Sequence, residues 1–337
     1  MTKLNLAIIG LGNIASKHLP VLAQFDDVEL VAFCDTNEER LHSVAAQYGV
    51  KQKFVDLPSL LAEVEVDAVF SFVNVLSTFS IVMACLEAGQ HTFLEKPPGL
   101  SSVETRQLAD LADKHGCLTM VGVNRRFYSS VKEAQQAIAT AGPLVSIVLD
   151  APENLARVRA MKFHPQEVIR HWIFANGIHG IDLFRYIGGE IIQMQTVNRR
   201  WFYEQPDSFG ALVEFKSGAI GHYISDWTSP GGWRMEVRGR DIKVLLEPLE
   251  QAKVIQRDGT TKALPIDDID VKFKAGFYAQ DRYFLDCVRQ KRTPESPAST
   301  LRDSIETMKL IEAIAGEEIS QSIMSEQAAR STEETNL

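Results

Sequence analysis

Ile8-Ile9-Gly10-Leu11-Gly12-Asn13-Ile14-Ala15 is the stretch that decides the fold of this chain. The apolar run from Leu4 to Ile9 predicts a buried strand that leads into the first glycine. The residues from Ser16 to Phe25 predict a helix, so strand, glycine turn and helix follow one another without a spacer. This order is the context in which a GxGxxA pattern indicates a dinucleotide-binding site.

Each small residue of the pattern has a separate task in such a site. Gly10 permits the tight turn, and Gly12 lets the backbone approach a pyrophosphate because it has no Cβ. Ala15 lets the helix pack close to the strand, and the N-terminus of that helix offers unpaired N–H groups to the anion. We therefore predict that the cofactor contacts Gly10, Leu11, Gly12, Asn13 and Ile14.

A second feature at a fixed spacing supports this interpretation. Val28 to Cys34 predicts another buried strand, which ends at Asp35, twenty residues after Ala15. A carboxylate at that place accepts hydrogen bonds from the ribose hydroxyls of NAD and repels the 2′-phosphate of NADP. We predict NAD in preference to NADP. A structural βαβ unit with a solvated Asp35 is the alternative.

Composition restricts the class of protein. A chain of 337 residues is too long for one comfortable core and predicts two domains. The net charge of −9 argues against nucleic acid or an anionic membrane as a partner. The four cysteines contain no CxxC pair, which is typical of free thiols in a reducing cytosol, and no apolar stretch approaches the ~20 residues of a membrane span. We expect a cytoplasmic protein.

Strand and helix patterns alternate through the first third of the chain, which predicts a doubly wound parallel (Rossmann) sheet in residues 1–121. Ligands bind such sheets at the carboxyl ends of the strands. Beyond the first two strands and the first helix, the expected strands are Lys53–Val55, Asp67–Val73, His91–Glu95 and Cys117–Val123. The expected helices are Glu38–Tyr48, Ser59–Glu63, Thr78–Ala88 and, opened by a capping box at Ser101 and Glu104, the helix through His115.

The pattern changes in residues 122–337, where we expect an α+β domain on a largely antiparallel sheet that binds substrate and mediates oligomerisation. Short turns such as Lys216-Ser217-Gly218 join several of its strands. The expected strands are Leu144–Asp150, Ile191–Asn198, Gly210–Lys216, Ala219–Trp227, Gly232–Gly239, Asp241–Glu247 and Lys253–Gln256. The expected helices are Val131–Ala141, Val168–Gly188, Phe277–Gln290 and Thr300–Gly316, with a frayed polar tail from Glu317.

Several motifs together carry a resemblance to a known family. They are GLGNIA, Asp35, Glu95-Lys96-Pro97, Arg126-Phe127 and the GIHGID run of Gly177–Asp182. The chain resembles the glucose–fructose oxidoreductase, inositol dehydrogenase and rhizopine-catabolism (Gfo/Idh/MocA) family from residue 3 to about residue 316. This resemblance implies an NAD(P)-dependent oxidoreductase that acts on the CH–OH group of a sugar, polyol or related compound, usually as an oligomer.

Lys96 is the first candidate for proton transfer. It follows the fifth strand, at the sheet edge where a nicotinamide would lie, and partial desolvation there would ease the loss of its proton. The resemblance implies His179 as its partner, although the aspartate that relatives carry four residues earlier is Ala175 here. A surface lysine and a core histidine are the alternatives. Asn176 can orient a substrate hydroxyl but cannot exchange a proton.

The predicted site residues fall into three groups. Those expected to be catalytic are Lys96 and His179. Those expected to touch the cofactor, besides the glycine turn and Asp35, are Val73, Asn74, Glu95 and Lys96. Those expected to touch substrate are Asn124, Arg126, Asn176 and His179, with packing or ion pairing as the alternative for Arg126. No metal is expected, because the histidines show no paired ligand spacing.

Two other functions remain open from the sequence. One is a carbonyl or imine reductase similar to the biliverdin reductases, which needs no Asp/His pair. The other is a non-catalytic NAD-binding sensor. In either case the second sheet has more apolar side chains than one covered face uses, so we expect a homodimer or homotetramer. These side chains are Ile191, Met194, Val197, Trp201, Ala211, Val213, Phe215, Ile220, Tyr223 and Trp227.

Overall fold

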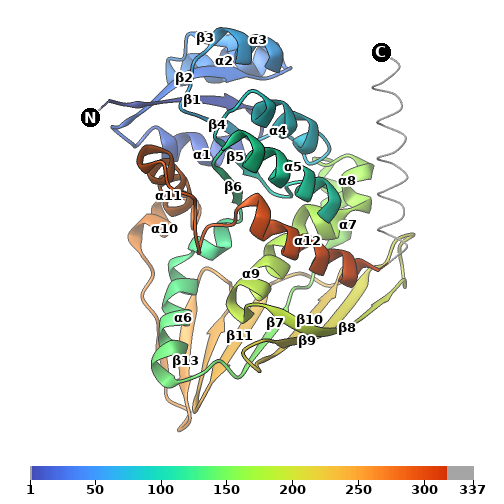
Figure 1. Ribbon diagram of the computed structural model, residues 1–337. Helices are drawn as coiled ribbons and strands as arrows, with labels where there is room; N and C mark the ends of the chain where they lie inside the picture. Colours follow the sequence, from blue (N-terminus) through green and yellow to red (C-terminus); the bar gives the residue numbers. More distant parts are fainter. Residues whose placement is uncertain (1, 317–337) are drawn as a thin grey trace. The chain divides into compact units, whose positions relative to one another are not determined.

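The computed structural model describes residues 2–316 (Figure 1). These form two compact units, residues 2–127 with 268–305 and residues 128–267 with 306–316. No helix among the described residues has both the length and the apolar character to cross a membrane. The predicted tail from Glu317 lies outside the described residues.

The first unit contains a parallel sheet of six strands, as predicted. Its order is β3-β2-β1-β4-β5-β6, and every neighbouring pair is parallel. The chain runs from β1 outward through β2 to β3 and then returns to β4 on the other side of β1. The strand order therefore reverses between β1 and β4, and at such a point a doubly wound sheet opens a crevice for a ligand. The strands are β1 Leu4–Ile9, β2 Val28–Cys34, β3 Gln52–Phe54, β4 Ala68–Ser71, β5 Thr92–Glu95 and β6 Thr119–Gly122.

Helices connect these strands and end where the sequence places stop signals. Gly49 follows the second helix in the left-handed region at φ 71°, a conformation that glycine adopts without strain. At the predicted capping box the Ser101 hydroxyl accepts the Glu104 N–H, while the Glu104 carboxylate accepts the N–H of Leu100. The helices are α1 Ala15–Leu22, α2 Glu38–Tyr48, α3 Leu57–Glu63, α4 Thr78–Glu87, α5 Ser102–His115, α10 Asp268–Lys272, α11 Phe277–Gln290 and α12 Leu301–Ala315, the last continuing into residues of the second unit, with the 3-10 turn η1 Asn124–Phe127.

Helix α11 follows the second sheet in sequence but belongs to the core of the first unit. Phe284 and Leu285 of α11 are buried in one cluster with Phe70 of β4 and Phe93 of β5. The ring of Phe284 meets those of Phe70 and Phe93 at centroid distances of 5.6 and 5.8 Å. The first unit is therefore completed by a helix that begins 155 positions after the last strand of its sheet ends.

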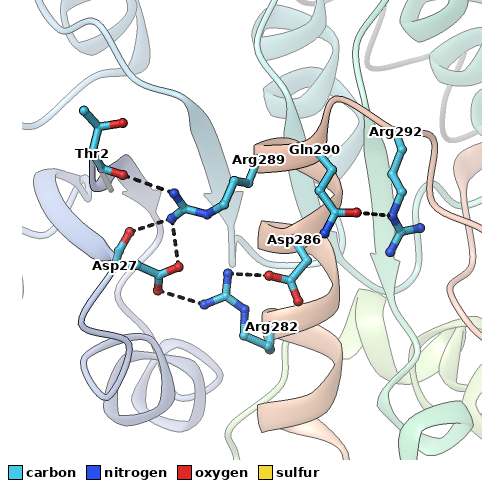
Figure 2. Close-up of polar contacts among 7 residues, drawn as sticks. All are labelled: Thr2, Asp27, Arg282, Asp286, Arg289, Gln290 and Arg292. Atoms are coloured by element: carbon cyan, nitrogen blue, oxygen red, sulfur yellow. Dashed lines mark hydrogen bonds and ion pairs between the residues drawn. The ribbon is translucent and has the colours of Figure 1, made fainter.

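Charged side chains along α11 tie this helix to Asp27, the residue directly before β2 (Figure 2). Asp27 accepts one hydrogen bond from Arg282 and another from Arg289, each of 2.8 Å, and Arg282 also pairs with Asp286. Burial raises the pKa of the Asp27 carboxyl, but the hydrogen bond from Arg282 and the charges of both arginines outweigh it and hold that pKa below its usual value.

We predict that Asp27→Asn lowers the free energy of unfolding at pH 7 by about 1 kcal/mol, because the variant keeps the shape but loses the charge. A carboxyl with a lowered folded pKa stabilises the protein above its unfolded pKa, and this contribution disappears as the pH falls through the folded value. The difference between variant and wild type therefore shrinks below about pH 4. Urea unfolding of variant and wild type at pH 7 and again below about pH 4 measures this difference. An equal difference under the two conditions would contradict the ionic role of Asp27.

The second unit is built on an eight-stranded sheet in the order β14-β13-β12-β11-β7-β10-β9-β8. Every neighbouring pair is antiparallel except β7 and β10, which confirms the expected largely antiparallel sheet. The strands are β7 Ser146–Asp150, β8 Ile191–Arg199, β9 Ser208–Phe215, β10 Ile220–Asp226, β11 Arg234–Gly239, β12 Ile242–Leu246, β13 Ala252–Gln256 and β14 Thr261–Ala263.

The helix predicted over Val168–Gly188 is broken in the structure. It consists of α8 Gln166–Arg170, a π-helical turn η2 at Ile173–Gly177 and α9 Ile178–Gly188, after an unpredicted helix α7 Leu155–Met161. Helix α9 lies on β7 and β10, and α6 Ser129–Ala141 lies on β11–β13 (Figure 1). Gly221 of β10 permits this close packing, because a Cβ there would collide with the ring of Phe184.

The opposite face of the sheet carries exposed apolar residues on β8, β9 and β10. The strand register places Val197, Leu212, Ile220 and Ile224 on this outer face, with side chains 44 to 48 % exposed. Of the apolar residues expected to be in excess, Val197 and Ile220 lie there, whereas Ala211, Val213, Phe215, Tyr223 and Trp227 are buried. We call Val197, Leu212, Ile220 and Ile224 the apolar outer face.

Candidate active site

The glycine turn lies at the carboxyl end of β1, directly before α1. Gly10 has φ +83°, and a Cβ there would lie 2.8 Å from the carbonyl oxygen of Phe72, so the fold itself requires glycine. Gly12 differs, because, apart from its own neighbours in the chain, no described protein atom lies within 4 Å of the position of its Cβ. The packing of the unit gives no reason for glycine at position 12, and the predicted approach of a pyrophosphate does.

Asp35 follows β2 at the same edge of the sheet and is buried. Its main hydrogen-bond partner was not predicted from the sequence. Arg40 of α2 donates two hydrogen bonds to the Asp35 carboxylate, of 2.9 and 2.7 Å. The N–H groups of Leu11 and Asn37 donate two more, of 2.7 and 2.8 Å. Burial alone would raise the pKa of the Asp35 carboxyl. The hydrogen bonds, of which those from Arg40 contribute most, outweigh burial and hold this pKa below its usual value, so the group stays ionised.

This geometry changes how Asp35 can receive a ribose. A carboxylate has about four sites for hydrogen-bond donors, and the four donors described here fill them. The Arg40 side chain is the one of these partners that is substantially exposed to solvent. For ribose hydroxyls to reach the carboxylate, we expect the guanidinium of Arg40 to give way, which makes Arg40 part of the candidate cofactor site.

The residues after β4 form a tight loop at the next position along the edge. Asn74 is exposed, and its side chain accepts the N–H of Leu76 at 2.9 Å and donates to the hydroxyl of Ser77 at 3.1 Å. The amide of Asn74 therefore shapes the loop that leads into α4, and Val73 before it is half-buried. The structure places both predicted cofactor residues at the expected strand end.

Glu95 is the last residue of β5, and Lys96 follows it at the carboxyl edge. Lys96 is half-buried, whereas Glu95 is buried and its carboxylate lies 3.1 Å from the Nε2 atom of His18. His18 was not predicted to take part in any site. The only feature of the sequence that could have pointed to it is its place in the helix that follows the GxGxxA pattern, three residues after Ala15.

Two predicted substrate residues, Asn124 and Arg126, have structural partners within the first unit. Both lie in η1 and are buried. The amide of Asn124 donates to the carbonyl of Ala275 at 2.9 Å, and the guanidinium of Arg126 lies 2.8 Å from the carboxylate of Asp303. The ion pair matches the alternative of a packing role for Arg126, and contact of either residue with substrate stays a prediction.

The other two predicted substrate residues, Asn176 and His179, lie in the second unit. Asn176 belongs to the π-helical turn, and its amide donates to the buried carboxylate of Glu153 at 2.5 Å. His179 is half-buried in the first turn of α9. Single π-turns within helices occur often at functional sites. Glu153 was not predicted, because the sequence gives no sign that it meets Asn176.

Asp182, the last residue of the GIHGID run, also lies in α9 and contacts α12. Its carboxylate accepts a hydrogen bond of 2.8 Å from the hydroxyl of Thr307, which also accepts one from Arg185 at 2.9 Å. Throughout residues 2–316, no group of three or more His, Cys, Asp or Glu side chains is arranged to hold a metal ion.

Family models match a part of each unit. Residues 4–123 match the model of the oxidoreductase family with an NAD-binding Rossmann fold, and residues 143–244 match the GFO/IDH/MocA C-terminal domain. The chain belongs to the Gfo/Idh/MocA oxidoreductase family. It is accordingly an NAD-binding oxidoreductase, and the predicted family, fold class and cofactor are confirmed.

Curated relatives of this Gfo/Idh/MocA protein are similar over most of their length. The 4-carboxy-2-hydroxymuconate-6-semialdehyde dehydrogenase of a Sphingobium species is 28% identical over 306 residues, covering 89% of this chain and 95% of the relative. The myo-inositol 2-dehydrogenase of Thermotoga maritima is 27% identical over 271 residues, covering 76% of this chain and 78% of the relative.

A solved structure shows the same fold. It is a levoglucosan dehydrogenase in complex with NADH and L-sorbose, which superposes with a TM-score of 0.82 at 16% sequence identity. The match covers 93% of this chain and 96% of the other. At that identity the likeness concerns the fold alone.

We predict that this Gfo/Idh/MocA protein binds NADH at least ~10-fold more tightly than NADPH, a difference of ~1.4 kcal/mol, because a 2′-phosphate would meet the ionised Asp35. Titration of both reduced nucleotides by fluorescence measures it. Asp35→Ser is the matched variant: it releases Arg40 from its ion pair, so we expect it to bind NADPH more tightly than the wild type does. Equal affinities of the wild type for the two nucleotides would contradict the role of Asp35.

Proposed function

We propose that the protein is an NAD-dependent dehydrogenase that exchanges hydride with the CH–OH group of a sugar, polyol or related compound. Lys96 and His179 handle the accompanying proton. The observation that carries the proposal is the position of Lys96 directly after β5, at the strand edge that also presents the glycine turn and Asp35. The bound nicotinamide supplies the hydride acceptor in the oxidising direction.

The residues of the first unit suit the binding of this cofactor. The N-terminus of α1 and the open approach to Gly12 suit a pyrophosphate, and Asp35 with Arg40 suits the adenosine ribose. Asn74 at the end of β4 and Lys96 at the end of β5 are neighbours along the sheet, because β4 pairs with β5. We place the reacting end of the cofactor at these two strand ends.

The substrate class is proposed from the relatives. The names of the Thermotoga maritima enzyme and of the levoglucosan dehydrogenase describe a cyclic polyol and an anhydrosugar as substrates. In this chain the position before Asn176 is Ala175, so the acid–base work falls on Lys96, with His179 as its helper. Asn176, held by Glu153, orients a substrate hydroxyl.

The test is reduction of NAD⁺ by a panel of myo-inositol, scyllo-inositol, D-apiose and levoglucosan, followed by absorbance of NADH. We expect turnover with at least one compound. Tight NADH binding without turnover of any of them would favour the non-catalytic sensor. Oxidation of NADH by biliverdin or an imine, with no polyol oxidised, would favour the reductase.

We predict that Lys96→Met folds and binds NADH but lowers kcat by ~10²–10⁴, the usual contribution of a placed general acid–base group. His179→Asn should lose less activity, because the asparagine can still hold the substrate hydroxyl. Initial rates at saturating NAD⁺ compare both variants with the wild type. A Lys96→Met enzyme with nearly normal kcat, or a greater loss in His179→Asn, would show that the roles are wrongly assigned.

We further propose that the apolar outer face packs against a second copy of this chain, giving a homodimer or homotetramer. The physical reason is the row of half-exposed apolar side chains over three neighbouring strands. We also propose a boundary between the cofactor and substrate domains at residues 121/122, and a cytoplasmic location for the protein.

Sedimentation at micromolar concentration tests the assembly. We predict an oligomer for the wild type and a monomer for Leu212→Glu, because the substitution places a charge in the centre of the proposed contact. Val103→Glu, at an exposed position on α5 of the first unit, is the control and should sediment as the wild type does. A monomeric wild type would refute the proposal.

A further inference from the structure

His18 is a fully buried histidine between two carboxylates of the first unit. It lies on α1, directly after the glycine turn, and both of its ring nitrogens have an acidic partner. Nδ1 lies 2.8 Å from Oδ2 of Asp281 on α11, and Nε2 lies 3.1 Å from Oε1 of Glu95 on β5. These residues are separated by 263 and 77 positions in the sequence, and the fold brings them together.

This arrangement favours a charged imidazole. A neutral imidazole donates from one nitrogen only, whereas the imidazolium donates from both. Burial lowers the pKa of His18, but the charge and hydrogen bond of Asp281, followed by those of Glu95, outweigh it and raise the pKa to about 9. Burial also raises the pKa of the Asp281 carboxyl. The proton lies on the imidazole, because that ring is the group that meets two carboxylates.

Aromatic rings fix the plane of the imidazolium. Phe72, the residue directly after β4, stacks on it with ring centroids 4.2 Å apart, and Phe277 of α11 lies at 4.5 Å. Phe93 meets it edge-on at 5.4 Å. A cation against aromatic faces is stabilised by the ring quadrupoles. His18 therefore has one defined orientation, in which its Nε2–H is aimed at Glu95.

Glu95 transmits this constraint to the next residue of the chain. It is the last residue of β5, and Lys96 is bonded to it directly. On the side of β6, a Cβ on Gly122 would collide with the Glu95 carboxylate. Glycine at position 122 therefore leaves the space that the carboxylate occupies. The turn that carries Lys96 is thus held at its first residue by a charge-assisted hydrogen bond.

We propose that His18 is a positioning residue for Lys96: from α1 it holds the carboxylate of Glu95 and so fixes the turn that presents the lysine. The inference rests on the proposed function, in which Lys96 transfers the proton. It also couples the two motifs of the site, because the helix that starts at the glycine turn carries the group that orients the Glu95-Lys96-Pro97 turn.

Two variants separate this role from a purely structural one. In His18→Asn the side-chain amide replaces Nδ1, which keeps a donor for Asp281 and removes the donor to Glu95. In His18→Gln combined with Asp281→Asn the longer amide replaces Nε2, which keeps a donor for Glu95, and the second change removes the unpaired charge. Both variants lose the imidazolium, so both are expected to lose stability.

The readouts are the NMR signal of Lys96 after ¹³C-dimethylation of the lysines, assigned with Lys96→Met, and kcat on the panel compound with the highest turnover. We expect His18→Asn to shift the Lys96 signal and to lower kcat by about tenfold or more, with KM changed less, because small displacements of a reacting group are costly. We expect the double variant to keep both readouts close to those of the wild type. NADH affinity should stay within about twofold in both.

An unchanged Lys96 signal in His18→Asn would overturn the inference, as would equal losses of kcat in the two variants. If His18→Asn does not fold, Glu95→Gln probes the same link and must move the signals of Lys96 and of the His18 ring together; failure to do so overturns the inference too. The proposed function fails separately, if Lys96→Met retains wild-type turnover. The Lys96 signal does not depend on turnover, so the two failures are distinguishable.

Discussion

The buried imidazolium of His18, held between two carboxylates, is the constraint on which the first unit depends. An unpaired charge in a core is very costly, and His18 is tolerated there because Asp281 and Glu95 both accept its hydrogen bonds. The three residues come from α1, β5 and α11, so one set of contacts joins the cofactor-binding helix, the strand before Lys96 and a helix from the far end of the sequence. The cluster is thus one of the contacts that hold α11 in the unit that begins the chain.

Much of the fold could be predicted because its signals are local. The bounds of α2 and α11 agree with the sequence, since Gly49 ends the first and a continuous amphipathic pattern defines the second. The π-turn at 173–177 was missed, because its apolar residues continue the pattern of a regular helix. The short elements α7 and β14 were missed as well, because segments of seven and three residues carry too little periodicity to stand out.

The site was predictable where a motif fixes the backbone, and not where a distant side chain completes it. Gly10 and Asp35 follow from spacing, and the structure gives a steric reason for the first and an ionised state for the second. Arg40 and Glu153 carry no motif, and their roles depend on which oxygen they reach in three dimensions. Arg126 illustrates the reverse case, because its motif suggested contact with substrate while its ion pair with Asp303 gives it a structural task.

The protonation state of His18 tests this account most directly. A group whose folded pKa exceeds its unfolded value of 6.5 stabilises the protein below that value, and the contribution is lost as the pH rises through about 9. The measurement is a pH titration of the ¹⁵N signals of the His18 ring by NMR, assigned with His18→Asn. The account predicts that both ring nitrogens stay protonated through neutral pH and titrate near pH 9. A neutral His18 ring at pH 7, with titration at or below 6.5, would contradict it.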